Sequence, residues 1–360
     1  MGGEIGFPGI SGRSEGSRKL RYVEYMLRKG INSAIVLLGL SILIFGISRI
    51  LPGDPARMSL GPYATQEQVE QLRAEMGLDK PLPVQYGRYL ANLFHGDFGK
   101  SFVSERNVRL DLASHLPATA ELVIVTVFWV AVFGVPLGAI GAVNKDTWID
   151  NTIKAFSFAA VVTPGFIVGL AFQLVFGYGL GWLPVTGRLS PHMAAANYAT
   201  GFLLLDSFAA RDWALFGDAW RHVILPSLAL SFAGIGQVIR ITRSSMLDVE
   251  NRDFIQVVRS YGVPDHIVTF RYILKPAFVP TLQVIGLTLA SLFGNAFLIE
   301  NVFSWPGMAK YGVTALMKKD LNALVGVVLI IGTAFVVVNL VVDVLMGLVD
   351  PRIRLKGAKE

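Results

Sequence analysis

Long apolar stretches separated by polar segments dominate the hydropathy pattern of this chain. Six stretches have the roughly 20 mostly apolar residues that a helix needs to cross a bilayer. None alternates apolar and polar residues in the way that is typical of a membrane β-strand. The pattern predicts an all-α, polytopic membrane helix bundle with six transmembrane helices. They cover Ile31–Leu51, Pro117–Val143, Ala155–Trp182, Val223–Ile241, Phe278–Val302 and Leu324–Leu348.

The composition supports this class of protein. Of the 360 residues, 53% are hydrophobic and only 16% are charged, whereas a soluble domain has roughly 25% charged residues. The chain contains no cysteine, which excludes disulfides and thiolate metal sites. The histidines are not grouped with carboxylates at ligand spacing, and no nucleophile and base pair emerges. We therefore expect no metal site, no cofactor and no catalytic residue in this chain.

Positive residues gather in three regions that lie on one side of a six-span bundle. These regions precede the first span, connect the fourth span to the fifth, and follow the sixth, whereas charges nearly balance over 52–116. By the positive-inside rule, both termini are cytoplasmic and the protein is a multi-pass cell (inner or plasma) membrane protein. The net charge of +6 thus reflects topology, and no nucleic-acid partner is expected.

The same topology divides the chain into regions. Residues 1–30 form a cytoplasmic tail and an interfacial helix, residues 31–350 a single transmembrane domain, and residues 351–360 a second cytoplasmic tail. The extended loops 52–116 and 183–221 are extracytoplasmic, and the loop 242–277 is cytoplasmic. Within the first external loop, periodicity predicts helices over 65–76, with Gly77 as a C-cap, and over 83–94.

Small and polar residues inside the spans indicate how the helices pack. Glycines four residues apart, at 134 and 138 and at 165 and 169, allow helix backbones to approach closely. Pro164 lies within the third span, where its missing amide donor should kink the helix. Polar side chains facing lipid are costly, so we expect Gln237, Gln283 and Asn295 to face the bundle interior or a wet cavity. They could line a translocation path, or simply form interhelical hydrogen bonds.

The fourth-to-fifth loop has the pattern of a helix, a sharp turn and a second helix. Apolar residues recur at three- and four-residue steps up to Tyr261, Gly262 suits a left-handed C-cap, and Pro264 suits the first turn of the next helix. Such a protrusion cannot bury its own apolar side, so a partner should. The candidate contact residues are Asp253, Phe254, Gln256, Val257, Val258, Tyr261, Gly262, Val263, Pro264 and Asp265. A basic surface resting on anionic head groups is the alternative, and it leaves the Gly-Val-Pro break unexplained.

Residues 253–280, with Gly262 at their centre, resemble the EAA loop of membrane subunits of ABC importers. Other segments, in order and over nearly the whole chain, are similar to the dipeptide and oligopeptide permease B-type subunits. The stretch Gln256-Val257-Val258 departs from the general motif, which has Glu-Ala-Ala there. The similar segments begin at Leu51 (LPGDPA), Met76 (MGLDKPLP), Gly96 (GDFGKS), Gly181 (GWLP), Leu225 (LP), Arg240 (RITRSS), Lys275 (KPAFVP), Glu300 (ENVFSWPG) and Val349 (VDPR).

This resemblance implies the type I permease fold of ABC importers and a function in ATP-driven peptide import. It further implies a second homologous permease subunit, two ATPase subunits that bind ATP and Mg, an extracytoplasmic solute-binding protein and membrane lipid as partners. Related systems carry nickel, glutathione or oligosaccharides, so the cargo stays open. An ion-coupled secondary transporter is a further alternative, although it needs midplane carboxylates or broken-helix ion sites, and a membrane enzyme is a weaker one.

Overall fold

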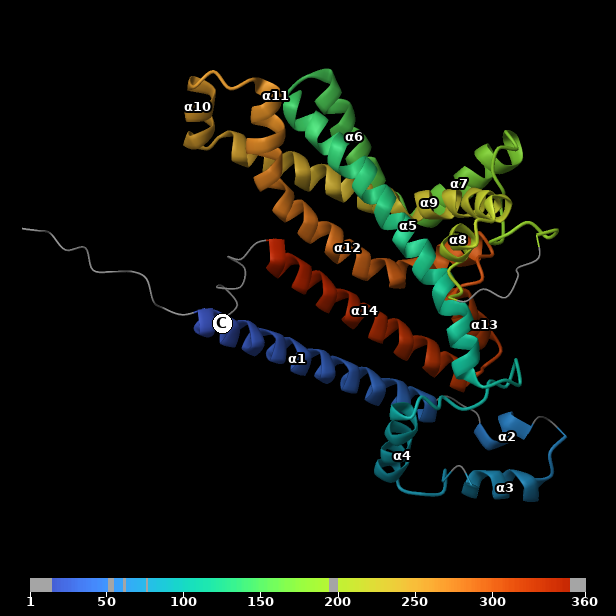
Figure 1. The fold of residues 1–360 in the computed structure, drawn as a ribbon. Helices are drawn as coiled ribbons and strands as arrows, with labels where there is room; N and C mark the ends of the chain where they lie inside the picture. The colour runs from blue at the N-terminus through green and yellow to red at the C-terminus, as the bar shows by residue number, and fades with distance from the viewer. Residues whose placement is uncertain (1–14, 51–54, 61–62, 76, 194–199, 350–360) are drawn as a thin grey trace, which may run out of the picture.

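The computed structural model describes residues 15–50, 55–60, 63–75, 77–193 and 200–349. Within these ranges the chain is helical, and its β pairing is limited to one isolated bridge between Lys100 and Asn107. Five described helical segments are long and apolar enough to cross a membrane (Figure 1). The all-α prediction is confirmed. These segments are α1 (Glu15–Ile50, through its part Leu27–Gly46), α5 (Val108–Val143), α9 (Trp213–Glu250), the run Asp265–Val302, and α14 (Leu321–Val349).

The third predicted span is bent instead of straight. Helix α6 (Trp148–Val162) is followed by α7 (Gly165–Phe172) and a π-helical segment, η1 (Gln173–Gly179), at an angle of 104°. The break lies at Thr163, whose backbone is extended, and Pro164. A proline disfavours helical geometry in the residue before it and cannot donate an amide hydrogen bond. Taken as one broken span, the bent pair raises the number of candidate crossings among the described residues to six.

Helices α5 and α9 form the tightly packed centre of the bundle. A Cβ added to Gly134 would lie 2.7 Å from Val238 Cγ1, and one added to Gly138 would lie 2.7 Å from Thr242 Cβ. On α7, a Cβ at Gly169 would lie 3.0 Å from a ring carbon of Phe303. The prediction that these glycines allow close helix approach is confirmed.

Short helices cover one end of the bundle (Figure 1). The predicted external helices are present as α3 (Gln66–Glu75) and α4 (Leu82–Phe94), and Gly77 has the left-handed φ of +65° expected of a C-cap. The apolar residues near 203 form a short helix and not a span. The remaining short helices at this end are α2 (Pro55–Leu60), α8 (Leu203–Ala209) and α13 (Met308–Met317).

The start of α1 and the end of α14 lie at the other end of the bundle, together with α10 (Asp253–Ser260) and α11 (Asp265–Ile267) (Figure 1). An even number of crossings produces this arrangement. Helix α1 passes residue 30 without a break, so an interfacial position for its first part stays a prediction. The tails over 1–14 and 351–360 lie outside the described residues.

Candidate functional site

The docking loop, defined as residues 242–277, protrudes from the bundle as predicted: a helix, a sharp turn and a second helix. Helix α10 ends at Ser260, and Gly262 follows with a φ of +74°. The Gly262 amide donates to the Arg259 carbonyl at 2.9 Å, which closes the turn. L-residues with a side chain rarely adopt this backbone conformation, so glycine is the residue that fits here.

The second helix begins one residue later than expected and has an irregular continuation. Pro264 is extended and immediately precedes α11, whose first residue is Asp265. Helix α11 passes into a π-helical segment, η2 (Val268–Leu274), and then into α12 (Lys275–Val302). Because Pro276 has no amide hydrogen, the carbonyl four residues before it cannot be paired in the α-helical pattern. No pattern in the sequence predicted this π-helical segment.

Ile255, which was not among the predicted site residues, anchors the protrusion. Its side chain is fully buried and packs in one cluster with Met246 and Val249 of α9 and with Val268 and Ile273 of η2. Val258 and Val263 pack partly against the same cluster. The predicted apolar side of α10 is therefore divided, because Val258 turns inward and supports the fold. Only the spacing of Ile255 and Val258, three residues apart, could have indicated this inner face.

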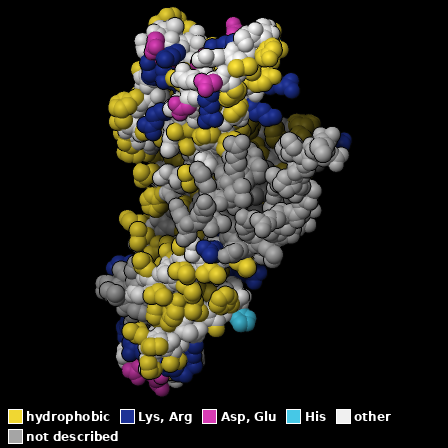
Figure 2. All heavy atoms as spheres, turned by 90° about the vertical axis from the view of Figure 1, so that its left-hand side faces the viewer, with side chains coloured by type: hydrophobic (Ala, Val, Ile, Leu, Met, Phe, Trp, Pro, Cys, Tyr) yellow, Lys and Arg dark blue, Asp and Glu magenta, His cyan; other side chains and the backbone are white. Residues whose placement is uncertain are grey.

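The opposite side of α10 carries an exposed apolar stripe. Phe254, Val257 and Tyr261, named here the outer stripe, are 41%, 52% and 83% exposed. Steps of three and four residues place them on one face of the helix. Apolar and charged side chains share the surface at this end of the molecule (upper part of Figure 2). The other predicted contact residues that are exposed are Asp253, Gln256, Gly262, Pro264 and Asp265.

Behind α10 lies a cavity of about 450 Å³ with charged walls. Glu250 at the end of α9 accepts a hydrogen bond from Arg259 Nη2 at 2.8 Å, and this pair bridges α9 to α10. Asp265 and Thr269 line the same cavity. The ion pair is partly exposed, so it orients α10 more than it stabilises the fold.

The base of the protrusion is braced by a buried ion pair. Asp150 at the start of α6 is fully buried and accepts from Arg243 Nε and Nη2 of α9 at 2.6 and 2.7 Å. Lys154 Nζ approaches the same carboxylate at 3.1 Å. A side-by-side, two-bond contact between guanidinium and carboxylate fixes geometry as well as charge. A hydroxyl contact at 3.1 Å between Thr242 and Thr281 joins α9 to α12, so three helices share one support.

The predicted path residues are not brought together inside this subunit. Gln237 on α9 and Gln283 and Asn295 on α12 are all exposed, so they do not face the interior of this chain's own bundle. That they face a wet cavity and line a translocation path stays a prediction. The two α12 residues are separated by about 18 Å along the helix and about 120° around it. Buried polar residues in the spans have partners instead: Gln173 Nε2 donates to the carbonyls of Val185 and Val302 at 2.7 and 3.1 Å.

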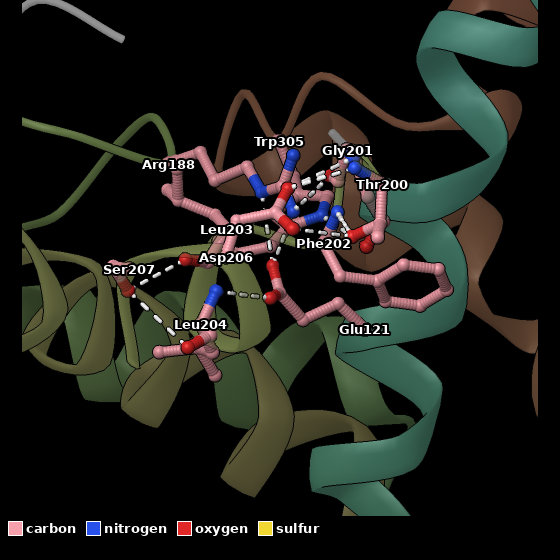
Figure 3. Close-up of polar contacts among 11 residues, drawn as sticks. Glu121, Arg188, Thr200, Gly201, Phe202, Leu203, Leu204, Asp206, Ser207 and Trp305 are labelled. Carbon is pink, nitrogen blue, oxygen red and sulfur yellow. Dashed lines mark hydrogen bonds and ion pairs between the residues drawn. The ribbon is translucent and has the colours of Figure 1, made fainter. Parts of the chain in front are cut away.

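A second polar cluster lies at the other end of α5 and was not predicted (Figure 3). Glu121 of α5 is buried and accepts from Arg188 Nε at 3.0 Å and from the Leu204 amide at 2.6 Å. Arg188 also donates to the Gly201 carbonyl at 3.0 Å and lies over the Trp305 ring. Two isolated charges far apart in sequence gave no local signal. Arg188 and the start of α8 at Leu204 are thus held against α5.

Next to this cluster is an apolar cavity of about 410 Å³. Glu121 borders it, but both of its carboxylate oxygens are occupied by the contacts described above. The cavity can therefore accommodate an apolar group and offers little hydrogen bonding. The other lining residues are Ile124, Val125, Phe202, Leu204, Leu205, Phe208 and Phe216.

Comparisons with known proteins match most of this chain. Residues 134–355 match the family described as "Binding-protein-dependent transport system inner membrane component", and residues 22–123 match "Binding-prot-dependent transport system membrane comp, N-term". The chain is 38% identical to the probable D,D-dipeptide transport system permease protein of Escherichia coli (strain K12), over 90% of this chain and 96% of the relative.

Two further relatives are similar over most of their length. The dipeptide transport system permease protein of Alkalihalophilus pseudofirmus is 34% identical, over 92% of this chain and 99% of the relative. The glutathione transport system permease protein of Salmonella paratyphi A is 33% identical, over 93% of this chain and the full length of the relative. These relatives are transport permeases and not enzymes. The chain is a multi-pass membrane protein and belongs to the family of binding-protein-dependent transport system inner membrane components, the permease subunits of ABC importers.

Proposed function

We propose that this chain forms half of the translocation path of an ATP-driven importer of di- or oligopeptides. The observation that carries the proposal is the outer stripe on α10, which stands exposed on a helix whose inner face is locked by Ile255. An exposed apolar face on a rigid protrusion is suited to a helix-in-groove contact. The groove belongs to an ATPase subunit, and two such subunits bind ATP and Mg.

The contacts at the base of α10 transmit the conformational change of the ATPases to the membrane helices. Closure of the ATPases moves the docking loop, and the contacts of Arg243 with Asp150 and of Thr242 with Thr281 pass this movement to α6, α9 and α12. The bundle then exchanges an outward-open cavity for an inward-open one, as rigid bodies. This chain performs no ATP hydrolysis. The start of α1 and the end of α14 lie at the same end as α10, which supports cytoplasmic termini.

A second, homologous permease subunit completes the path. Gln237, Gln283 and Asn295 are exposed on spans of this subunit, and amide side chains that face lipid are costly. Contact with a partner subunit or with water between the two subunits removes this cost. The three residues therefore belong to the surface between the subunits, where the path runs.

Peptide cargo is supported by relatives that transport dipeptides, D,D-dipeptides and glutathione, itself a short peptide. An extracytoplasmic solute-binding protein selects the cargo and delivers it to the external loops 52–116 and 183–221. Glutathione is the second candidate cargo, since its permeases are similar over nearly all of this chain. No relative described above favours nickel or an oligosaccharide.

The test is uptake of a labelled dipeptide by proteoliposomes that contain the purified complex. We expect uptake only when ATP and the solute-binding protein are both present, with glutathione as a competing cargo. Co-purification should recover two ATPases and a second permease with each copy of this chain. Uptake by this chain alone, driven by an ion gradient, would establish a secondary transporter instead.

A further inference from the structure

A cavity of about 230 Å³ lies at the end of the bundle opposite the docking loop. Helix α4 forms one wall, and the ends of α1 and α14 form another, at Phe45, Leu321 and Val325. Two residues one turn apart on α4, Gln85 and Tyr89, also line it. None of the transport steps described above uses this cavity.

Two buried polar atoms at this cavity lack a hydrogen-bond partner within the described residues. Gln85 is 9% exposed, and its Nε2 donates to the carbonyls of Leu78 and Lys80 at 3.1 and 2.7 Å. These two bonds fix the amide, so that Oε1 is a buried acceptor without a donor. The Tyr89 hydroxyl is buried and unpaired as well. Unpaired buried polar groups are costly and rare, and they indicate an occupant that completes them.

The charged residues of the cavity define the chemistry of that occupant. Arg88 and Asp97 both line it, together with Asn92. A guanidinium suits a phosphate group, whereas Gln85 Oε1 lacks a donor. The Asp97 carboxylate already accepts from the Gly99 amide through Oδ1 at 2.9 Å, and its second oxygen can accept from an N–H donor. Burial, with the neighbouring Tyr86, raises the pKa of the Tyr89 hydroxyl to about 12, so this group remains protonated at neutral pH. The walls therefore match a head that carries both a phosphate and an N–H donor.

The position of the cavity next to two apolar spans indicates that its occupant also has an apolar part. Phe45 is near the end of the apolar segment Leu27–Gly46, and Leu321 begins the apolar segment Leu321–Val344. Both spans leave the hydrocarbon layer at this level. The rings of Phe45, Tyr86 and Tyr89 lie 5.3 to 6.2 Å apart, and aromatic clusters of this kind are typical of the membrane interface.

We propose that this cavity binds the headgroup of a phospholipid with a primary amine, of the ethanolamine type. The phosphate lies at Arg88 and accepts from the Tyr89 hydroxyl, the ammonium donates to Gln85 Oε1 and Asp97, and the apolar part of the lipid continues along α1 and α14. A choline headgroup has no N–H donor and leaves Gln85 Oε1 unpaired. The site thus discriminates between two headgroups of similar size and equal charge, and it requires no particular cargo.

Native mass spectrometry of the purified complex with its partner subunits tests this site. After delipidation, the complex is titrated with phosphatidylethanolamine or with phosphatidylcholine. We expect the ethanolamine lipid to be retained roughly 3- to 10-fold more strongly, the effect of one or two hydrogen bonds. Tyr89→Phe should weaken its retention by a similar factor, without lowering the unfolding temperature, because the lost hydroxyl has no partner among the described residues.

The matched control is Tyr86→Phe, which removes a hydroxyl from the same helix at a residue that does not line the cavity. The Tyr86 hydroxyl lies 2.8 Å from Ser41 Oγ of α1, so this variant should change stability and not lipid selectivity. Equal retention of both lipids by the unaltered complex would overturn the proposal. Unchanged lipid retention in Tyr89→Phe would also overturn it. This holds even if that variant weakens binding of the solute-binding protein, because the cavity would then serve a protein contact and not a lipid.

Discussion

Gly307 lies against the carboxylate of Glu300 so closely that a Cβ added to the glycine would be 2.3 Å from Oε1. Glu300 is fully buried and accepts from Thr119 Oγ1 at 2.5 Å and from the amides of Ala309 and Lys310 at 2.9 and 3.0 Å. It therefore pairs the free amides at the start of α13, and its side chain cannot move aside. The glycine of the segment ENVFSWPG is required by this contact and not by backbone conformation.

Gly307→Ala should destabilise the subunit by about 1–3 kcal/mol, the usual cost of overpacking. Thermal unfolding of the purified complex measures this change. Gly217→Ala is the control, because nothing lies within 4 Å of a Cβ at that helical position, and it should leave the unfolding temperature unchanged or slightly higher. An unfolding temperature equal to that of the unaltered complex in Gly307→Ala would show that Glu300 can relax.

Gly262→Val should uncouple transport from ATP hydrolysis while leaving membrane insertion intact. Open space surrounds this glycine, so the effect comes from its φ of +74°, which a β-branched residue adopts only at a cost. Gly262→Asn is the matched control, since asparagine tolerates this conformation. Uptake and stimulated ATPase activity in proteoliposomes are the measurements, and normal uptake by the valine variant would contradict the role of the turn.

Tyr261→Ala should weaken retention of the ATPase by roughly tenfold or more, the effect of losing a central aromatic contact. Because this side chain is 83% exposed, the variant subunit should fold normally. Phe94→Ala removes an equally exposed aromatic residue at the other end, on α4, and should have no effect on the ATPase. Titration of the purified ATPase against the permease pair compares the two, and equal affinities would show that the outer stripe is not the contact.

Arg243→Gln should destabilise the base of the docking loop by about 3–5 kcal/mol, because it leaves the buried Asp150 carboxylate without its main partner. The double variant with Asp150→Asn removes both charges and should recover part of the loss. Unfolding temperatures of the two single variants and the double variant show how strongly Arg243 and Asp150 are coupled in stability. If the double variant were no more stable than Arg243→Gln alone, the pair would have no role in bracing α9 against α6.

Topology can be tested directly because the chain has no cysteine. A single cysteine in place of Asp265 should react with an impermeant maleimide only after the membrane is opened. A cysteine in place of Glu67, exposed on α3, should react in intact cells. Labelling of the first variant from outside would place α10 on the wrong side for an ATPase and would refute the proposed coupling.

Local signals were sufficient where one residue type determines the conformation. Gly262 and Gly77 both have left-handed backbones, as their positions after amphipathic segments predicted. The bend in the third span was indicated only by Pro164, since its size of 104° depends on how α7 packs on α9. A proline marks where a helix can break and does not determine the angle.

Tertiary pairing explains what the sequence analysis missed. Ile255 and Val257 are both β-branched and apolar, and only the position of η2 decides that the first is buried and the second exposed. Glu121 and Arg188 meet across 67 positions, so neither has a local partner that could have identified it. The three amides in the spans were recognised as unsuited to lipid, but the sequence of one chain carries no information about a contact with another subunit, which we propose for them.

At the end far from the docking loop, three positions of α5 together hold three separate parts of the chain, which are residues 300–308, Arg188 and Leu204. Ala118 accepts from the Trp305 indole, Thr119 binds Glu300 and the Met308 amide, and Glu121 binds Arg188 and Leu204. The same helix, 36 residues and about 54 Å long, ends with Ala142 in the cluster beneath α10. Under the proposed coupling, a tilt of this helix would displace all of these segments together, so this end of the bundle would open and close as one unit.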